Sequence, residues 1–322
     1  SKDIEDCYEE IVSLYNDKIL FSEDDYEKYA LSAVASPIKA MCLHIAHDCN
    51  LRCKYCFAST GDFGQGRMLM DYETGKRAID FLIERSGDRK FLEVDFFGGE
   101  PSLNFGTVEK LVEYARSQEE PHNKKFRFTV TTNGVHLTDE MIDFINKEMY
   151  NVVLSIDGRK EVHDHMRPFR KGAGSYDLIV PKFQKLAESR NQEKYYIRGT
   201  FTRNNLDFSN DILHFADLGF KQMSIEPVVG DDTEPYAIQK EDLPQIFEEY
   251  DKLAKFLIER EKSGRGFNFF HFMIDLEGGP CVSKRLSGCG SGTEYLAVTP
   301  WGDFYPCHQF VGQEEFLMGN VD

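Results

Sequence analysis

Three cysteines near the beginning of the chain carry the strongest chemical signal in the sequence. They are Cys49, Cys53 and Cys56, spaced C-x3-C-x2-C directly after a predicted strand. Three thiolates on one loop can hold three irons of a cubane iron–sulfur cluster, which leaves the fourth iron without a protein ligand. An open coordination position is typical of metal chemistry rather than of structural support. A structural zinc knuckle is the alternative, with His44 or His47 as the fourth ligand.

A second group of cysteines lies toward the C-terminal end. Cys289 and Cys307 flank a predicted β-hairpin with strands at 295–298 and 304–305. A hairpin brings its two ends together, so Cys289 and Cys307 can lie close enough to bind one metal centre. A disulfide or buried thiols are the alternatives. Because the first residues are charged and form no signal peptide, clustered cysteines favour metal ligation over disulfides.

Composition excludes several classes of protein. The 322 residues carry a net charge of −17, which argues against a general binder of nucleic acids or anionic membranes. The 26 Phe and 15 Tyr supply ample core for a folded protein. No apolar run approaches the ~20 residues that a membrane-spanning helix needs. We therefore expect a cytoplasmic protein, and the absence of an initial Met suggests an excerpt of a longer gene product.

The elements that must position these cysteines follow a regular alternation after two N-terminal helices, expected at 3–20 and 22–32. Strands are predicted at 40–46, 91–97, 126–131, 151–156, 195–201 and 222–227. Helices are predicted near 71–86, 104–117, 138–148, 175–189, 206–218 and 241–262. Such alternation predicts an α/β fold with parallel strands and right-handed crossovers. Six units are two short of a full eight-stranded barrel, so we predict a partial (β/α)6 TIM-like barrel, with a doubly wound sheet as the alternative.

The Cys49–Cys56 motif, set after the first strand of six such units, resembles the radical S-adenosylmethionine (SAM) superfamily over roughly residues 38–228. In that family the open iron of a [4Fe–4S] cluster binds the amino and carboxylate groups of SAM. One electron then cleaves a C–S bond, and the resulting 5′-deoxyadenosyl radical removes a hydrogen atom from the substrate. Tyr55, the aromatic residue before the last cysteine, also fits the family motif.

Further matches to the family lie where the strands end. Gly98, Gly99 and Glu100 resemble its GGE motif, which serves the methionine amino group, and glycines there allow close backbone approach to a ligand. Asn133 and Ser155 follow or end the third and fourth strands. Both resemble positions that contact SAM, so the resemblance implies a SAM site built from the carboxyl ends of the strands.

Two more residues receive roles from the resemblance. Arg167 resembles an arginine that holds the SAM carboxylate, for which a bidentate guanidinium is suited, while a surface arginine is the alternative. Ile225 is placed to pack on adenine, with plain strand core as the alternative. We interpret 163–165 as a polar loop that leads to Arg167, Ser175 as a helix N-cap and Cys42 as a core residue.

The spacing of Cys289, Gly302 and Cys307 resembles the opening of a SPASM domain, C-x(9–15)-G-x4-C, an extension that binds auxiliary iron–sulfur clusters. A whole SPASM domain continues with further cysteines that this sequence lacks. The resemblance implies one or two auxiliary [4Fe–4S] clusters, with Cys281 among the ligands of one. The expected segments are an N-terminal helical linker ending a leader-peptide recognition region (1–37), the barrel (38–235), a helical linker (236–275) and the start of the SPASM domain (276–322).

Radical SAM enzymes with SPASM extensions mostly modify ribosomally made peptides. This sequence most resembles thioether-forming maturases of six-cysteine (SCIFF) peptides, the sactipeptide or ranthipeptide synthases. The resemblance implies Cys-to-carbon crosslinking in a Cys-rich precursor peptide, with flavodoxin or ferredoxin as electron donor. One alternative is an anaerobic sulfatase-maturing enzyme, which needs a carboxylate base that the sequence does not locate. Another is an iron–sulfur electron carrier.

Overall fold

The computed structural model describes residues 2–23, 36–275, 277 and 288–322. Contacts divide the chain into two compact units, Ser1–Ser36 with Gly278–Gly290, and Pro37–Glu277 with Ser291–Asp322. In the first unit, the predicted N-terminal helix is confirmed as α1 (Lys2–Asn16), none of whose residues is buried. It ends before the predicted residue 20 because Lys18 adopts a left-handed φ of 57°. Most of the helix predicted at 22–32 lies outside the described residues.

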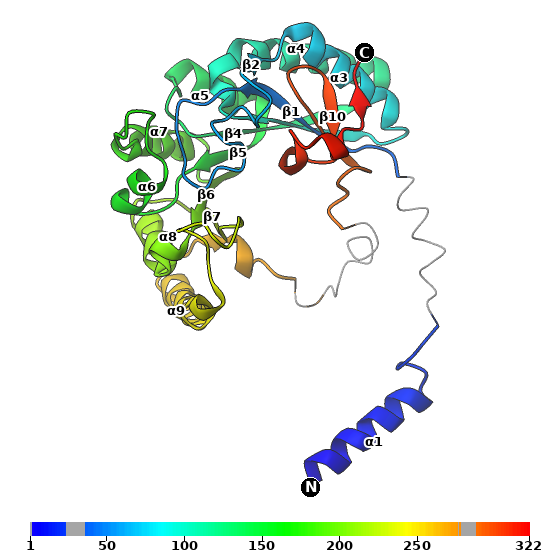
Figure 1. The fold of residues 1–322 in the computed structure, drawn as a ribbon, viewed down its shortest axis with the longest axis vertical. Helices are drawn as coiled ribbons and strands as arrows, with labels where there is room; N and C mark the ends of the chain where they lie inside the picture. The colour runs from blue at the N-terminus through cyan, green and yellow to red at the C-terminus, as the bar shows by residue number, and fades with distance from the viewer. Residues whose placement is uncertain (1, 24–35, 276, 278–287) are drawn as a thin grey trace. The chain divides into compact units, whose positions relative to one another are not determined.

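The second unit is built on one sheet with the strand order β11-β10-β9-β1-β3-β4-β5-β6-β7-β8. Its parallel strands are β1 (Ala40–His47), β3 (Phe91–Gly98), β4 (Lys125–Thr132), β5 (Met149–Ser155), β6 (Tyr195–Phe201), β7 (Gln222–Pro227) and β8 (Asn268–Phe269). The sheet curves, and the helices lie along its outer side (Figure 1). The predicted six-unit partial barrel is thereby confirmed.

The crossover helices are α3 (Tyr72–Arg85), α4 (Phe105–His122), α5 (Asp139–Glu148), α7 (Tyr176–Ser189), α8 (Phe208–Asp217) and α9 (Leu243–Lys262). Each begins within two residues of its predicted start. Asp71 is the N-cap of α3, because its side chain accepts a hydrogen bond from the Thr74 backbone N–H at 2.7 Å. One helix was not predicted, α6 (Lys160–Met166), which lies where we expected a polar loop.

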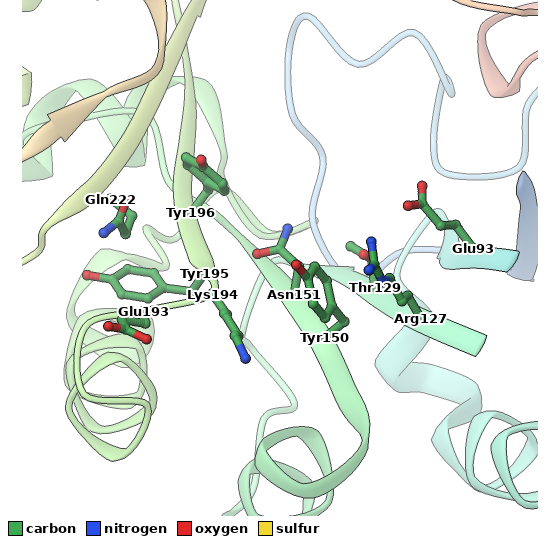
Figure 2. A pocket seen from close by; sticks show the side chains of 10 residues that line it. All are labelled: Glu93, Arg127, Thr129, Tyr150, Asn151, Glu193, Lys194, Tyr195, Tyr196 and Gln222. Atoms are coloured by element: carbon green, nitrogen blue, oxygen red, sulfur yellow. The ribbon is translucent and has the colours of Figure 1, made fainter. Parts of the chain in front are cut away.

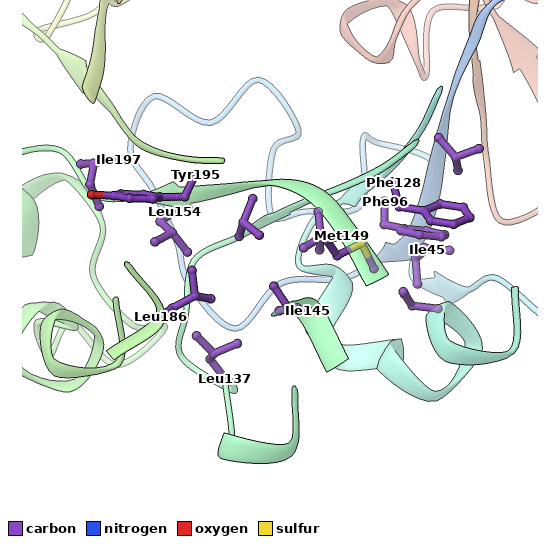
Figure 3. Packing of buried hydrophobic residues seen from close by; sticks show 14 of the residues in the cluster. Ile45, Phe96, Phe128, Leu137, Ile145, Met149, Leu154, Leu186, Tyr195 and Ile197 are labelled. Carbon is purple, nitrogen blue, oxygen red and sulfur yellow. The ribbon is translucent and has the colours of Figure 1, made fainter. Parts of the chain in front are cut away.

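Burial alternates along β3 to β6, as the two-residue period of a strand requires. One face packs against the helices, where Phe96 and Phe128 lie close to Met149 and Ile145 (Figure 3). We call the opposite face of these strands the lumen face. Its members are Glu93, Asp95 and Phe97 on β3, Arg127, Thr129 and Thr131 on β4, Asn151, Val153 and Ser155 on β5, and Tyr196, Arg198 and Thr200 on β6.

The C-terminal strands extend the barrel sheet. The predicted hairpin is confirmed as β9 (Tyr295–Val298) and β10 (Asp303–Tyr305), which pair antiparallel. β9 also pairs in parallel with β1, a connection that the sequence did not predict. Two short strands complete the sheet, β11 (Gly319–Asn320) beside β10 and β2 (Met68–Leu69) beside β1. None of the described helices is long and apolar enough to cross a membrane.

Candidate active site

The loop after β1 carries Cys49, Cys53 and Cys56 at the carboxyl end of the barrel. All three thiols are largely buried, and the Cys49 and Cys53 thiolates would repel each other and that of Cys56. Burial is the largest influence on the pKa of Cys49 and of Cys53, and it raises both to about 12. The Arg167 guanidinium acts against burial and lowers the pKa of all three thiols. The structure therefore brings the three predicted ligands together under one cation.

This donor set fits an iron–sulfur cluster better than a single zinc ion. Among the described residues, no three His, Cys, Asp or Glu side chains are arranged to hold one metal ion. His44 and His47, the alternative zinc ligands, instead share a hydrogen bond of 3.0 Å between their rings and are fully buried. With pKa values near 12, the Cys49 and Cys53 thiols keep their protons unless a bound metal displaces them, which is how thiolate sites are loaded.

The Gly98–Glu100 turn packs against the cysteine loop rather than standing open. A Cβ at Gly98, whose φ is +124°, would lie 2.3 Å from the Ala46 carbonyl oxygen. A Cβ at Gly99 would lie 2.2 Å from the Asp48 carbonyl oxygen. The two glycines thus permit close approach of backbone to backbone, where we had expected approach to a ligand. Their contact with SAM stays a prediction.

Glu100 positions the end of β4. Its buried carboxylate accepts hydrogen bonds from the Ser102 N–H at 3.0 Å, the Thr132 hydroxyl at 2.7 Å and the Asn133 N–H at 2.7 Å. The Asn133 side-chain amide in turn donates to Oδ1 of Asn50 at 2.8 Å and approaches the Cys49 sulfur at 3.6 Å. Glu100 therefore fixes Asn133, and Asn133 fixes the cysteine loop.

Asn50 has an unsatisfied donor at the predicted site. Its side-chain nitrogen is buried and has no hydrogen-bond partner among the described residues. A buried donor without a partner is costly, so an acceptor supplied by a ligand would stabilise this position. The residue was not predicted as part of the site, although it stands inside the cysteine motif.

Arg167, Asp157 and Tyr55 form a buried network beside the cysteine loop. The Arg167 Nε donates to Asp157 Oδ1 at 2.9 Å and to the Tyr55 hydroxyl at 2.8 Å, and that hydroxyl donates to Asp157 Oδ1 at 2.7 Å. The Arg167 side chain is 13% exposed and that of Asp157 is 0% exposed. Arg167 is therefore no surface arginine. Its two terminal nitrogens make no hydrogen bond within the described part of the chain, so they can receive a carboxylate.

His163 and Ser175 make hydrogen bonds to the backbone of Asp157 and Arg167. Residues 163–165 lie on helix α6, so our interpretation of them as a loop was wrong. His163 is fully buried on α6, and burial lowers its pKa to about 4, so the ring is neutral. Its Nδ1 accepts from the Asp157 N–H at 3.3 Å, and its Nε2 donates to the Ser175 hydroxyl at 2.9 Å. That hydroxyl donates to the Arg167 carbonyl at 3.1 Å. Ser175 stands at the predicted N-cap position, but its side chain makes no capping bond.

Two other predicted SAM contacts differ in their surroundings. Ser155 ends β5 on the lumen face and is partly exposed. Ile225 is 0% exposed and belongs to the main hydrophobic core, on the strand face opposite Ser224 and Glu226. This placement favours the core role for Ile225, and its contact with adenine stays a prediction.

The predicted auxiliary ligands are described only in part. Cys281 lies outside the described residues. Cys289 falls in the first unit and Cys307 in the second, where Cys307 follows β10. Their ligand roles stay predictions. Cys42 is 1% exposed on β1, which confirms it as a core residue.

Sequence reasoning missed Asp157 and His163, the two residues that hold Arg167 in place. The bond from Tyr55 to Asp157 joins residues 102 positions apart, and the contact of His163 is with a backbone N–H. Neither contact can be recognised from the spacing of residues in the sequence. Asp157 directly precedes Gly158 at the end of a predicted strand, and a carboxylate at such an end was the one hint available.

The sequence and the fold were compared with known proteins. Residues 43–199 match the model of the radical SAM superfamily. An uncharacterized protein of Methanocaldococcus jannaschii is 27% identical, over 88% of this chain and 89% of its own length. A cysteine-type anaerobic sulfatase-maturating enzyme of Clostridium novyi is 25% identical, over 85% of this chain and 74% of its own. The subtilosin biosynthesis protein AlbA of Bacillus subtilis is 24% identical, over 99% of this chain and 66% of its own.

Two solved structures share the fold. The anSMEcpe protein with bound AdoMet superposes with a TM-score of 0.71 at 20% identity, covering 88% of this chain and 78% of its own. Streptococcus suis SuiB bound to its precursor peptide SuiA superposes with a TM-score of 0.64 at 15% identity, covering 99% of this chain and 75% of its own. The cysteine motif, the partial barrel and these matches lead to one conclusion. The chain is a radical SAM enzyme whose fold resembles those of anSMEcpe and SuiB.

Proposed function

We propose that this enzyme modifies a ribosomally made, cysteine-rich peptide and joins a cysteine sulfur to a carbon of the same peptide. The observation that supports it most is the convergence of three thiols, the Glu100–Asn133 contact and the Arg167 network at one end of the barrel. Similarity to AlbA and to peptide-bound SuiB supports a peptide substrate. The SCIFF peptides are the proposed class of substrate, and flavodoxin or ferredoxin is the proposed electron donor.

The residues of the site have different binding roles in the proposed function. Cys49, Cys53 and Cys56 would hold a [4Fe–4S] cluster, which when bound with SAM supplies the fragment that removes a hydrogen atom from the substrate. Arg167 offers its terminal nitrogens to the SAM carboxylate, held in place by Asp157. Asn50 offers its unsatisfied donor to a ligand acceptor. The buried surroundings exclude water, which strengthens each of these interactions.

The C-terminal cysteines are the proposed ligands of an auxiliary iron–sulfur cluster. Cys281, Cys289 and Cys307 would ligate an auxiliary cluster that anchors the substrate sulfur and accepts the electron left over when the C–S bond forms. A metal-bound sulfur stays deprotonated, which suits bond formation to carbon. The further cysteines that a whole SPASM domain would carry are not in this sequence, so a second auxiliary cluster is not assigned to residues of this chain.

The experiment is anaerobic reconstitution with iron and sulfide, followed by reaction with SAM, reductant and a six-cysteine peptide. We expect 5′-deoxyadenosine and a peptide that has lost two hydrogens per crosslink, with the sulfur retained. Alkylation of the product would leave the crosslinked cysteines unlabelled. Formation of 5′-deoxyadenosine with an unmodified peptide would contradict the proposed substrate class but not the SAM chemistry.

Sulfatase maturation is the second candidate, favoured by similarity to the sulfatase-maturating enzyme of C. novyi. It would oxidise a single Cys or Ser of a sulfatase to formylglycine. A sulfatase-derived peptide in the same assay separates the two, because formylglycine formation from Cys replaces sulfur by oxygen, whereas thioether formation keeps the sulfur. The electron-carrier alternative has no remaining support, since the chain is a radical SAM enzyme.

A further inference from the structure

Asp95 is a carboxyl group on the lumen face that forms no ion pair within the described residues. Asp95 occupies the middle of β3, opposite Cys42 of β1 and Thr129 of β4 in the register of the sheet. It is largely buried yet partly open to the lumen. Residues on one strand face repeat about every 7 Å, so Asp95 lies one step below Phe97. Phe97 contacts Phe57, which directly follows the cysteine motif, with ring centroids 6.4 Å apart. Asp95 is thus within a side chain's reach of the carboxyl end.

The surroundings of Asp95 make it a suitable base. Burial, and then the neighbouring Glu93 carboxylate, raise its pKa to about 6, while Thr129 lowers it. Within the part of the chain that the structure describes, no cationic side chain contributes to this shift. Cys42 and Tyr295 are the other titratable groups that face it, and its charge raises the pKa of both. A carboxyl group with a pKa near the working pH can both accept and release a proton.

A cavity of about 410 Å³ lies at the opposite end of the barrel from the cysteines and reaches Thr129, the register partner of Asp95. Glu93, two residues before Asp95, and Thr129, its register partner, both line this cavity (Figure 2). The remaining lining is mostly polar or aromatic and comes from the starts of β4 to β7, namely Arg127, Tyr150, Asn151, Glu193, Lys194, Tyr195, Tyr196 and Gln222. A polar cavity of this size can hold water.

The proposed function requires a proton acceptor in the lumen. In the overall conversion of a substrate carbon radical and a thiol to a thioether, one C–S bond forms and one S–H bond breaks. One proton is released when the sulfur binds the auxiliary cluster, and one electron is released when the C–S bond forms. Formation of a C=S bond from a carbon that already bears the thiol releases the same pair, so the requirement is common to both candidate functions. The electron needs a one-electron acceptor of the iron–sulfur class.

We propose that Asp95 accepts this proton from the substrate and passes it to solvent through the cavity at the amino ends of the strands. The inference rests on the proposed function, because it assigns a residue to a step of that reaction. It also supplies the carboxylate base that the sequence did not locate. The cysteines and Arg167 bind SAM at one end of the lumen, and Asp95, in the middle of β3, transfers the proton toward the cavity at the other end.

The test compares the wild type with Asp95→Asn and counts both modified peptide and 5′-deoxyadenosine. We expect 5′-deoxyadenosine formation to be retained and modified peptide per 5′-deoxyadenosine to fall about 100-fold. In the wild type this ratio should fall as the pH is lowered through about 6, and Asp95→Glu should keep that dependence. Glu109→Gln is the control, an exposed carboxyl on the outer helix α4, and should leave the reaction coupled.

A second readout does not depend on activity. Because the folded state raises the pKa of Asp95, its charged form opposes folding at high pH and the effect vanishes once both states are protonated. Asp95→Asn should therefore raise Tm at about pH 8 and leave it unchanged at about pH 3. Unchanged coupling in Asp95→Asn, or a Tm that falls at both pH values, would overturn the inference. A wild type that makes 5′-deoxyadenosine but modifies neither peptide would instead overturn the proposed function.

Discussion

The Nε of Arg167 lies 2.9 Å from Oδ1 of Asp157, and this ion pair is almost closed to solvent. The Nε of the guanidinium is thereby bound within the protein, while the terminal nitrogens make no hydrogen bond among the described residues. An arginine fixed in this way loses little side-chain entropy when it binds a carboxylate. The pair thus turns a flexible cation into a preorganised receptor.

Arg167→Lys should weaken SAM binding by about tenfold to a hundredfold, because an ammonium cannot pair with Asp157 and a ligand carboxylate in the same fork geometry. Equilibrium binding of SAM to the reconstituted enzyme measures it. Arg159→Lys is the matched control, since Arg159 makes a similar ion pair with buried Asp211 at 2.8 Å but takes no part in the Tyr55–Asp157–Arg167 network. Equal dissociation constants for the wild type and Arg167→Lys would contradict the role of Arg167.

His163→Gln should reduce the loss of stability in acid. Burial depresses the folded-state pKa of His163 to about 4, so its contribution is present above the unfolded pKa and disappears as the pH falls toward about 4. This residue alone accounts for at most about 3 kcal/mol of that loss. Denaturant unfolding at several pH values between about 6.5, the ordinary pKa of His, and about 4 measures the free energy of unfolding of the variant and of the wild type. His122→Gln, at the exposed end of α4, is the control and should lose as much stability in acid as the wild type. If the free energy of unfolding changed equally with pH in both variants, a buried neutral His163 would be refuted.

Cys289→Ala should remove iron and stop crosslinking while SAM is still cleaved without coupling. The reason is that the proposed auxiliary cluster anchors the sulfur and accepts the electron, but takes no part in SAM cleavage. Iron analysis and product mass, measured on one preparation, test both halves. Cys7→Ala, an exposed cysteine of α1, serves as the control. Full iron content together with normal crosslinking in Cys289→Ala would rule out the ligand role.

The barrel could be predicted because its signal is local. The strands predicted at 195–201 and 222–227 coincide with β6 and β7, because short runs of strand-forming residues between turns can be recognised from consecutive residues. α6 was missed because it has only seven residues and its first residue has no side-chain cap. The pairing of β9 with β1 was missed for another reason, because a register between strands some 250 residues apart leaves no periodic trace.

The site was predictable in its residue types and less so in its contacts. The cysteine spacing and Arg167 both indicate the carboxyl end of the barrel, because such motifs lie where strands end. The glycines of the GGE motif differ from expectation, since they pack against the carbonyls of Ala46 and Asp48. Asp95 gave no signal at all, because its raised pKa comes from burial and from the register of three strands.

The most direct measurement concerns the three cysteines themselves. Cys49, Cys53 and Cys56 are replaced together by Ala, and iron content, visible absorbance and 5′-deoxyadenosine are measured under reducing, oxygen-free conditions. We predict that the triple variant forms no 5′-deoxyadenosine and loses the iron of one cluster, while absorbance from the C-terminal cysteines remains. The wild type should lose activity on exposure to oxygen, because a cluster with an open iron is easily oxidised. SAM cleavage at the wild-type rate in the triple variant would contradict the account.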